Sequence, residues 1–286
     1  MAIEETRFSY RGADGVGLAG FRWSGHGAPR AVLQLAHGAG EHCGRYRERL
    51  APIVEDGFTI YAADHRGHGR TSGMSHLGDF GPGGAEACLS DMTLLAQRAR
   101  AENPGLPLIM MGHSMGAIFT QAWLPEHSDL VDAVVLSGTT GSGPRFEGEW
   151  NSAFPRARTD YDWLSRDTAE VDRYVADPFC GIRFVEASNA SFLALAARAL
   201  HASDPSTIRP GLPVYVLVGE DDPINNRLAG VRPLIEGYRV AGLDVTFKSY
   251  PGGRHEMLNE INRDEVISDL LAWLRKTFPV WRTGRS

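Results

Sequence analysis

The chain of 286 residues has few cysteines, no long apolar run and no excess of positive charge. Its three widely spaced cysteines fit a reducing compartment and suggest neither a disulfide framework nor a metal site. With a net charge of −6 and no basic stripe, no nucleic-acid partner is expected. No apolar run reaches the length of a membrane span, and residues 1–10 lack the apolar centre of a secretory signal. We therefore expect a cytoplasmic globular protein without a metal or cofactor.

The sequence does contain short apolar runs that alternate with helical patterns. The runs predict strands over 31–36, 58–63, 108–111, 131–136, 214–218 and 245–250. Alternation of apolar and polar residues over 6–10 and 16–23 predicts an antiparallel hairpin. Apolar residues at helical spacing predict helices over 45–56, 86–101, 115–125, 228–240 and 266–278. Alternation of this kind predicts an α/β protein with a mostly parallel sheet, whose ligands bind at the carboxyl ends of the strands.

The pattern changes between about Gly138 and Pro210. Strand-like runs disappear there and aromatic residues accumulate, among them Trp150 and Trp163. We predict that residues 139–210 form a helical cap, inserted into a core made of residues 1–138 and 211–286. The aromatic residues fit either an apolar slot for an acyl chain or the hydrophobic core of the cap itself.

The segment Gly112-His113-Ser114-Met115-Gly116 lies between an apolar run and a helical run. A Gly-x-Ser-x-Gly in this setting is typical of a nucleophile elbow, although the pattern alone also fits an ordinary glycine-rich turn. The two glycines are expected because so tight a bend leaves no room for a Cβ. A helix that starts at Met115 directs its free N–H groups towards the space beside the Ser114 oxygen. The segment predicts Ser114 as a nucleophile.

A serine nucleophile needs a histidine base, which in turn needs a carboxylate to fix its tautomer. Of the ten histidines, His255 follows both a candidate acid and the last predicted strand. Asp221 and Asp222 both follow the strand 214–218; the spacing of that loop favours Asp222 and leaves Asp221 as the alternative. All three side chains are expected at one edge of the sheet.

An oxyanion hole needs two backbone N–H donors. We expect one from Met115, the residue after the nucleophile, and the other from Ala39 in the glycine turn after the strand 31–36. His37 and His42 flank that turn, and we expect them to hydrogen-bond the loop rather than to bind a ligand.

Together these residues give the chain a close resemblance to the α/β-hydrolases of the monoacylglycerol lipase and lysophospholipase group, the serine aminopeptidase S33 type. The matching motifs are His-Gly-Ala-Gly-Glu-His at 37–42 with Arg45 and Tyr46, Asp64 with Arg-Gly-His-Gly at 66–69, Gly-His-Ser-Met-Gly at 112–116, Asp222, Tyr-Pro-Gly-Gly-Arg-His-Glu at 250–256, and in the insertion Asp-Trp-Leu-Ser-Arg-Asp at 162–167, Asp177-Pro178 and Cys180-Gly181. The resemblance implies the α/β-hydrolase fold: a mostly parallel eight-stranded sheet flanked by helices, with a helical cap.

The resemblance also implies a serine carboxylic-ester hydrolase that forms an acyl-serine intermediate. Ser114 attacks, His255 transfers the proton and Asp222 orients the histidine, while Ala39 and Met115 hold the oxyanion. The implied substrate is a small acyl ester of lipid type, a monoacylglycerol or a lysophospholipid, and the cap is expected to touch a membrane surface transiently.

Three other functions stay open at this point. An aminopeptidase of the S33 type would need acidic groups to hold a substrate ammonium, and the insertion contains Glu147, Glu149, Asp160, Asp162 and Glu186. A general short-chain esterase would use the same catalytic residues. A non-enzymatic ligand-binding protein of this fold is disfavoured because all three candidate catalytic side chains are present.

Overall fold

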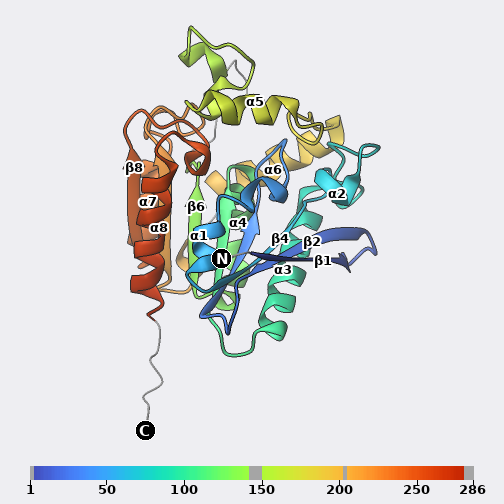
Figure 1. Cartoon of the computed structure of the whole chain (residues 1–286), viewed down its shortest axis with the longest axis vertical. Coiled ribbons are helices and arrows are strands. Elements are labelled where there is room, and N and C mark those ends of the chain that lie inside the picture. Colours follow the sequence, from blue (N-terminus) through green and yellow to red (C-terminus); the bar gives the residue numbers. More distant parts are fainter. Residues whose placement is uncertain (1–2, 142–149, 202–204, 280–286) are drawn as a thin grey trace.

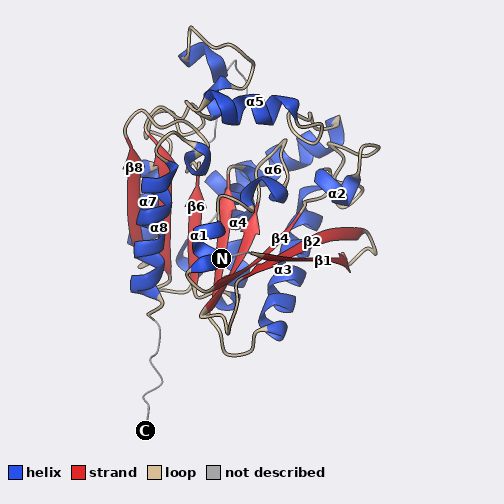
Figure 2. Ribbon diagram, viewed as in Figure 1, coloured by secondary structure: helices blue, strands red, loops and turns tan. Residues whose placement is uncertain are grey.

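Eight strands form a single sheet in the computed structural model, which describes residues 3–141, 150–201 and 205–279. The strand order is β1-β2-β4-β3-β5-β6-β7-β8. The strands are β1 (Glu4–Arg11), β2 (Gly17–Ser24), β3 (Ala31–Ala36), β4 (Phe58–Ala63), β5 (Leu108–His113), β6 (Ala133–Ser137), β7 (Pro213–Gly219) and β8 (Asp244–Tyr250). β2 is antiparallel to both of its neighbours and the remaining pairs are parallel, so the predicted mostly parallel eight-stranded sheet is confirmed (Figures 1 and 2).

Helices cover both faces of the sheet, which explains why the inner strands are apolar throughout rather than alternating. The helices are α1 (Ala51–Glu55), α2 (Gly69–Ser72), α3 (Gly84–Glu102), α4 (Met115–His127), α5 (Thr168–Ala176), α6 (Glu186–His201), α7 (Arg232–Val240) and α8 (Arg263–Thr277). On β5, Ile109 and Met111 pack with α1 and α8, whereas Met110 packs on the other face with α3, α4 and α7. The chain therefore has the α/β-hydrolase fold that its motifs implied.

All five predicted helices differ in their bounds from the structure. Those predicted over 86–101 and 266–278 shift by three residues or fewer at each end, to α3 and α8, and the other three differ for reasons that the structure shows. The helix predicted over 45–56 is a 3₁₀ turn, Cys43–Tyr46, followed by α1, because Pro52 fits only the first turn of a helix. The helix predicted from residue 228 begins at Arg232, since Asn226, Arg227 and Leu228 have positive φ angles. The helix predicted over 115–125 continues through Pro125 to His127 as α4.

The segment 150–201 lies across the carboxyl ends of the strands, where Figure 1 shows α5 above the sheet. Trp163, Leu164 and Tyr174 form a small apolar cluster with Ile224 from the loop after β7. By contrast, α6 packs through Phe192 and its neighbours against α3 and α4, as part of the main core. Within the described ranges, no helix is both long enough and apolar enough to cross a bilayer.

Candidate active site

Ser114 stands on the bend between β5 and α4, at φ 52° and ψ −117°. A non-glycine residue in this region is strained, and such strain is held only where the surroundings enforce it. The Ser114 N–H donates to the Ser137 carbonyl on β6 at 3.0 Å, which fixes the bend to the sheet. A Cβ on Gly112 would lie 2.4 Å from the Gly116 carbonyl oxygen, so the bend has the close main-chain approach that the motif predicts.

Gly116→Ala should prevent this bend from closing. A Cβ at Gly116 would lie 2.1 Å from the Ala36 carbonyl oxygen, and neither backbone can yield without moving β3 or α4. We expect a loss of more than about 3 kcal/mol in the free energy of unfolding, measured by urea denaturation. The matched control is Gly237→Ala in α7, where a Cβ meets nothing within 4 Å and helix propensity favours alanine by up to about 1 kcal/mol. Equal stability of the two variants would contradict the close approach.

The glycine turn after β3 runs alongside the bend. The Gly38 N–H donates to the Glu41 carboxylate at 2.6 Å, and the Gly40 N–H donates to His68 Nε2 at 3.2 Å. Among the residues that the structure describes, the N–H groups of Ala39 and Met115 have no hydrogen-bond acceptor, and both residues line the same cavity as Ser114. These two free donors are suited to bind an oxyanion.

His255 follows β8 and Asp222 follows β7, and the structure brings their side chains together. His255 Nδ1 lies 2.9 Å from Asp222 Oδ2, and both residues are almost completely buried. The other oxygen of Asp222 accepts the Ile224 N–H at 2.8 Å, which holds the carboxylate in place. The neighbouring Asp221 is only half-buried, and its backbone N–H bonds to the Gly253 carbonyl.

The electrostatics of the pair favour a basic imidazole. Burial disfavours the charged ring, but the charge and hydrogen bond of Asp222 outweigh burial and raise the pKa of His255 above its usual 6.5. His255 Nε2 has no hydrogen-bond partner within the described part of the chain, and no hydrogen bond joins it to Ser114. Both residues line one cavity, and such contacts often shorten only when substrate binds.

This cavity has a volume of about 730 Å³ and lies between the sheet and the segment 150–201. Its wall is largely aromatic and aliphatic, and includes Trp150, Tyr161, Trp163, Phe184, Phe192, Ile118 and Leu193. Asn151, Asp160, Arg183 and Asn189 contribute polar groups. Trp163 and Tyr174 line the cavity and also belong to one apolar cluster with Leu164 and Ile224. Aromatic residues of the segment 150–201 therefore form part of the cavity wall and part of that segment's own apolar core.

A comparison with known protein families gives a match to the serine aminopeptidase S33 family over residues 27–262. The chain belongs to this family. A monoacylglycerol lipase of Mycolicibacterium smegmatis is 33% identical over 96% of this chain and 98% of its own length, and a monoglyceride lipase of Mus musculus is 28% identical over 92% and 88%. Among solved structures, a thermostable carboxyl esterase of Bacillus coagulans matches 97% of this chain and all of its own, at 25% identity and a TM-score of 0.89.

In this S33 chain, a buried ion network connects the glycine turn to the loop that carries His255. Glu41 accepts hydrogen bonds from the Gly38 N–H, from Tyr46 and from Arg45. Arg45 also forms a two-pronged ion pair with Glu256, at 2.6 and 2.7 Å. Glu41, Arg45 and Glu256 belong to the sequence motifs at 37–46 and 250–256, but no motif predicts that they pair. The available signal was an acidic residue near each of two predicted site residues: Glu41 lies near Ala39, and Glu256 follows His255. Arg45 is a basic residue close enough in sequence to Glu41 to pair with it.

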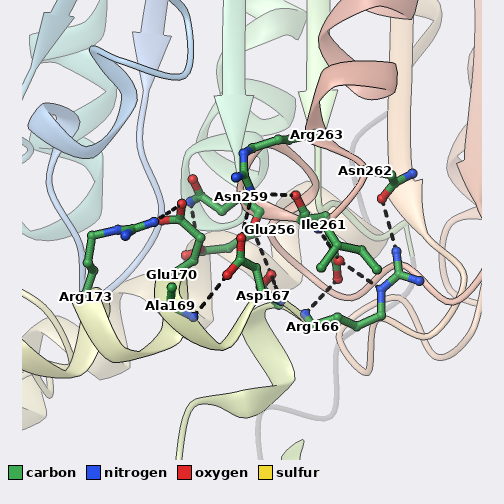
Figure 3. Close-up of polar contacts among 12 residues, drawn as sticks. Arg166, Asp167, Ala169, Glu170, Arg173, Glu256, Asn259, Ile261, Asn262 and Arg263 are labelled. Atoms are coloured by element: carbon green, nitrogen blue, oxygen red, sulfur yellow. Dashed lines mark hydrogen bonds and ion pairs between the residues drawn. The ribbon is translucent and has the colours of Figure 1, made fainter.

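The segment 150–201 is fastened to the same loop. The backbone carbonyls of Trp163 and Leu164 accept the N–H groups of His255 and Glu256, at 3.4 and 2.8 Å. Figure 3 shows Asp167, at the start of α5, pointing towards Arg263; their ion pair measures 2.7 Å. Arg166 adds an ion pair with Glu260 at 2.9 Å. The segment that covers the cavity therefore also positions the backbone of His255.

Proposed function

We propose that this chain is a serine carboxylic-ester hydrolase that cleaves lipid-like monoesters, monoacylglycerols or lysophospholipids, through an acyl-serine intermediate. The buried His255–Asp222 pair, beside Ser114 in an aromatic-lined cavity, is the observation that carries the proposal. The lipase names of its relatives from Mycolicibacterium smegmatis and Mus musculus support the substrate class.

In the proposed mechanism, His255 Nε2 takes the proton of the Ser114 hydroxyl as its oxygen attacks the ester carbonyl. Asp222 holds the His255 proton on Nδ1 and stabilises the imidazolium. The Ala39 and Met115 N–H groups bind the tetrahedral oxyanion. His255 then protonates the leaving alcohol, and a water activated by the same nitrogen releases the fatty acid from Ser114. No metal or cofactor takes part in these steps.

We also propose that residues 139–210 act as the cap, with residues 1–138 and 211–286 as the core. Exposed apolar side chains on and next to α5 and α6, namely Val175, Val185 and Leu193, support a transient contact of the cap with a membrane surface. The cytoplasm stays the expected location; the free thiols of Cys43, Cys88 and Cys180 are compatible with it.

The aminopeptidase alternative has less support. Of the five acidic residues that it invoked, Asp160 lines the cavity, whereas the Asp162 carboxylate is occupied by Thr159 and the Arg158 N–H. Glu147 and Glu149 lie outside the described residues. Glu186 is exposed at the start of α6 and is not among the residues that line the cavity. Glu41 and Glu256 do line it, but both carboxylates are paired with Arg45. A wall with so many aromatic and aliphatic side chains favours an acyl chain over a peptide N-terminus.

A rate series on p-nitrophenyl esters of increasing chain length, run beside a monoacylglycerol, a lysophospholipid and an aminoacyl anilide, tests the proposal. We expect kcat/KM to increase with acyl length because each buried methylene adds about 0.8 kcal/mol of binding. The lipid monoesters should be cleaved and the anilide should be the slowest substrate. A faster anilide would favour the aminopeptidase, and a maximum at the shortest acyl chain would favour the general esterase.

The pH dependence of kcat/KM should follow His255. The base must be neutral, and its pKa lies above 6.5, so the rate should fall as the pH drops through that raised value. Burial lowers the pKa of His65 to about 3 and of His113 to about 4, so neither titrates in this range. The measurement is kcat/KM from about pH 5 to about pH 9. A one-proton acidic limb centred below 6.5 would contradict the assignment.

A further inference from the structure

A second cluster of reactive side chains lies outside the proposed catalytic centre, where the C-terminal end of α5 meets the turn after β3. His42 Nε2 is 2.9 Å from Asp177 Oδ2. The Cys180 thiol lies beside them, and one donor atom from each of the three residues falls within 4.8 Å of the other two. All three residues are partly exposed, so water and small ions can reach them.

These donors form the set that zinc selects in proteins. Imidazole nitrogen, thiolate sulfur and carboxylate oxygen are its usual ligands. Tetrahedral bonds of about 2.0 to 2.3 Å place ligand atoms roughly 3.3 to 3.8 Å apart, which the spacing here allows after small side-chain movements. Three protein ligands leave the fourth position to water. Because His42 is 135 residues from Asp177, no local ligand motif marks the site in the sequence.

The backbone already holds the donors in place. The Phe179 N–H donates to Asp177 Oδ1 at 2.9 Å, which leaves Oδ2 directed at His42. The Cys180 N–H donates to the Asp177 carbonyl at 3.0 Å, so both ligands belong to one tight turn. A hollow of about 440 Å³, lined by His42, Asp177 and Phe179, gives an ion a route to the site.

The charges around the hollow are compatible with a cation. Arg173 and Arg70 also line it, and the charge of Arg45 acts on Asp177 and Cys180. Arg45 is paired with both Glu41 and Glu256. Arg173 is paired with Glu170 at 3.2 Å, and the Arg70 guanidinium lies over the Phe21 ring, 5.5 Å from its centre. The carboxylate of Asp177 and the thiolate of Cys180 would together balance the two charges of a zinc ion.

We propose that His42, Asp177 and Cys180 form a zinc site that fastens the C-terminal end of α5 to the turn that carries Ala39. The neutral His42 ring binds through Nε2 with its proton on Nδ1, and the Cys180 thiol releases its proton to water. At present Tyr174 and the Gly181 N–H join this end of α5 to the Gly40 carbonyl, at 2.7 and 2.9 Å. The ion adds a cross-link to these two bonds and raises Tm as its concentration rises.

Titration of the full chain with Zn²⁺, in competition with a chromophoric chelator, tests the site. We expect one ion per chain, and binding at least tenfold weaker in Cys180→Ser and in His42→Ala. Co²⁺ in place of Zn²⁺ should give a sulfur-to-cobalt charge-transfer band that Cys180→Ser abolishes. The matched controls are Cys88→Ala, which removes a buried thiol elsewhere, and His76→Ala, which removes an exposed imidazole. Both should bind as the wild type does.

Two results would overturn the proposal: no binding at micromolar Zn²⁺, or unchanged affinity in Cys180→Ser. Circular dichroism without metal shows whether each variant folds, and Asp177→Asn replaces any that does not. Because the readout is ion binding, the result is independent of whether the chain hydrolyses esters.

Discussion

Replacing Ser114 with alanine is expected to lower kcat for ester hydrolysis by roughly 10⁵-fold or more, without unfolding the protein. The oxygen that would form the acyl bond is lost, and no other hydroxyl can take its place on the bend. Alanine keeps the Cβ, so the strained backbone at φ 52° is unchanged and the free energy of unfolding should stay within about 1 kcal/mol. Initial rates with a p-nitrophenyl ester and urea denaturation measure the two effects.

A fluorophosphonate probe provides the control for this loss. The wild-type chain should be labelled at Ser114, and Ser114→Ala should not be labelled at all. Ser90→Ala, which removes an exposed hydroxyl on α3, should keep both labelling and activity. A Ser114→Ala variant that retains more than about 1% of the rate would show that another nucleophile is at work, and an unlabelled wild type would favour a binding protein.

Asp222→Asn should lower kcat by about 10⁴-fold. The asparagine oxygen would keep the hydrogen bond from the Ile224 N–H, which turns the NH₂ group towards His255 Nδ1. The ring must then carry its proton on Nε2, the nitrogen that in the proposed mechanism accepts the proton of Ser114. Single-turnover rates with a p-nitrophenyl ester separate this chemical defect from weaker substrate binding.

Asp221→Asn is the matched control, because it makes the same chemical change one residue away. Asp221 is half-buried and Asp222 is the carboxylate on His255, so the rate should fall less than about tenfold. If Asp221→Asn were the more damaging of the two, the acid of the triad would have to be reassigned.

Local patterns were sufficient to predict most of the fold. Each apolar run matched one strand, and the runs were clearest for the inner strands β3 to β7, because strands covered on both faces are apolar at nearly every position. The glycines at 112 and 116 likewise identified a bend that excludes side chains. Errors arose where one residue overrode the pattern: Pro52 divides a predicted helix, and the positive φ of Leu228 delays the start of α7.

Long-range pairing could not be predicted in the same way. Arg45 is 211 residues from Glu256, and Tyr174 is 134 residues from Gly40. No periodicity relates such residues, since their contacts depend on how distant loops and the segment 150–201 come together at the edge of the sheet. The candidate catalytic side chains were easier to select because parallel topology sends the loops after β5, β7 and β8 to one edge. Their roles remain predictions until the variants are measured.

The bonds from the Trp163 and Leu164 carbonyls to the backbone of His255 and Glu256 constrain any redesign of this enzyme. Grafting the 150–201 segment of a relative onto this chain, to obtain a new chain-length preference, also replaces the two carbonyls that hold the backbone of His255, the proposed general base, and of Glu256. A successful chimera must also take residues 250–263 from the same relative. The N–H groups at 255 and 256 and the carbonyls at 163 and 164 then come from one parent protein. A graft without residues 250–263 would combine an altered pocket with a misaligned imidazole, and its low turnover would be mistaken for poor substrate fit.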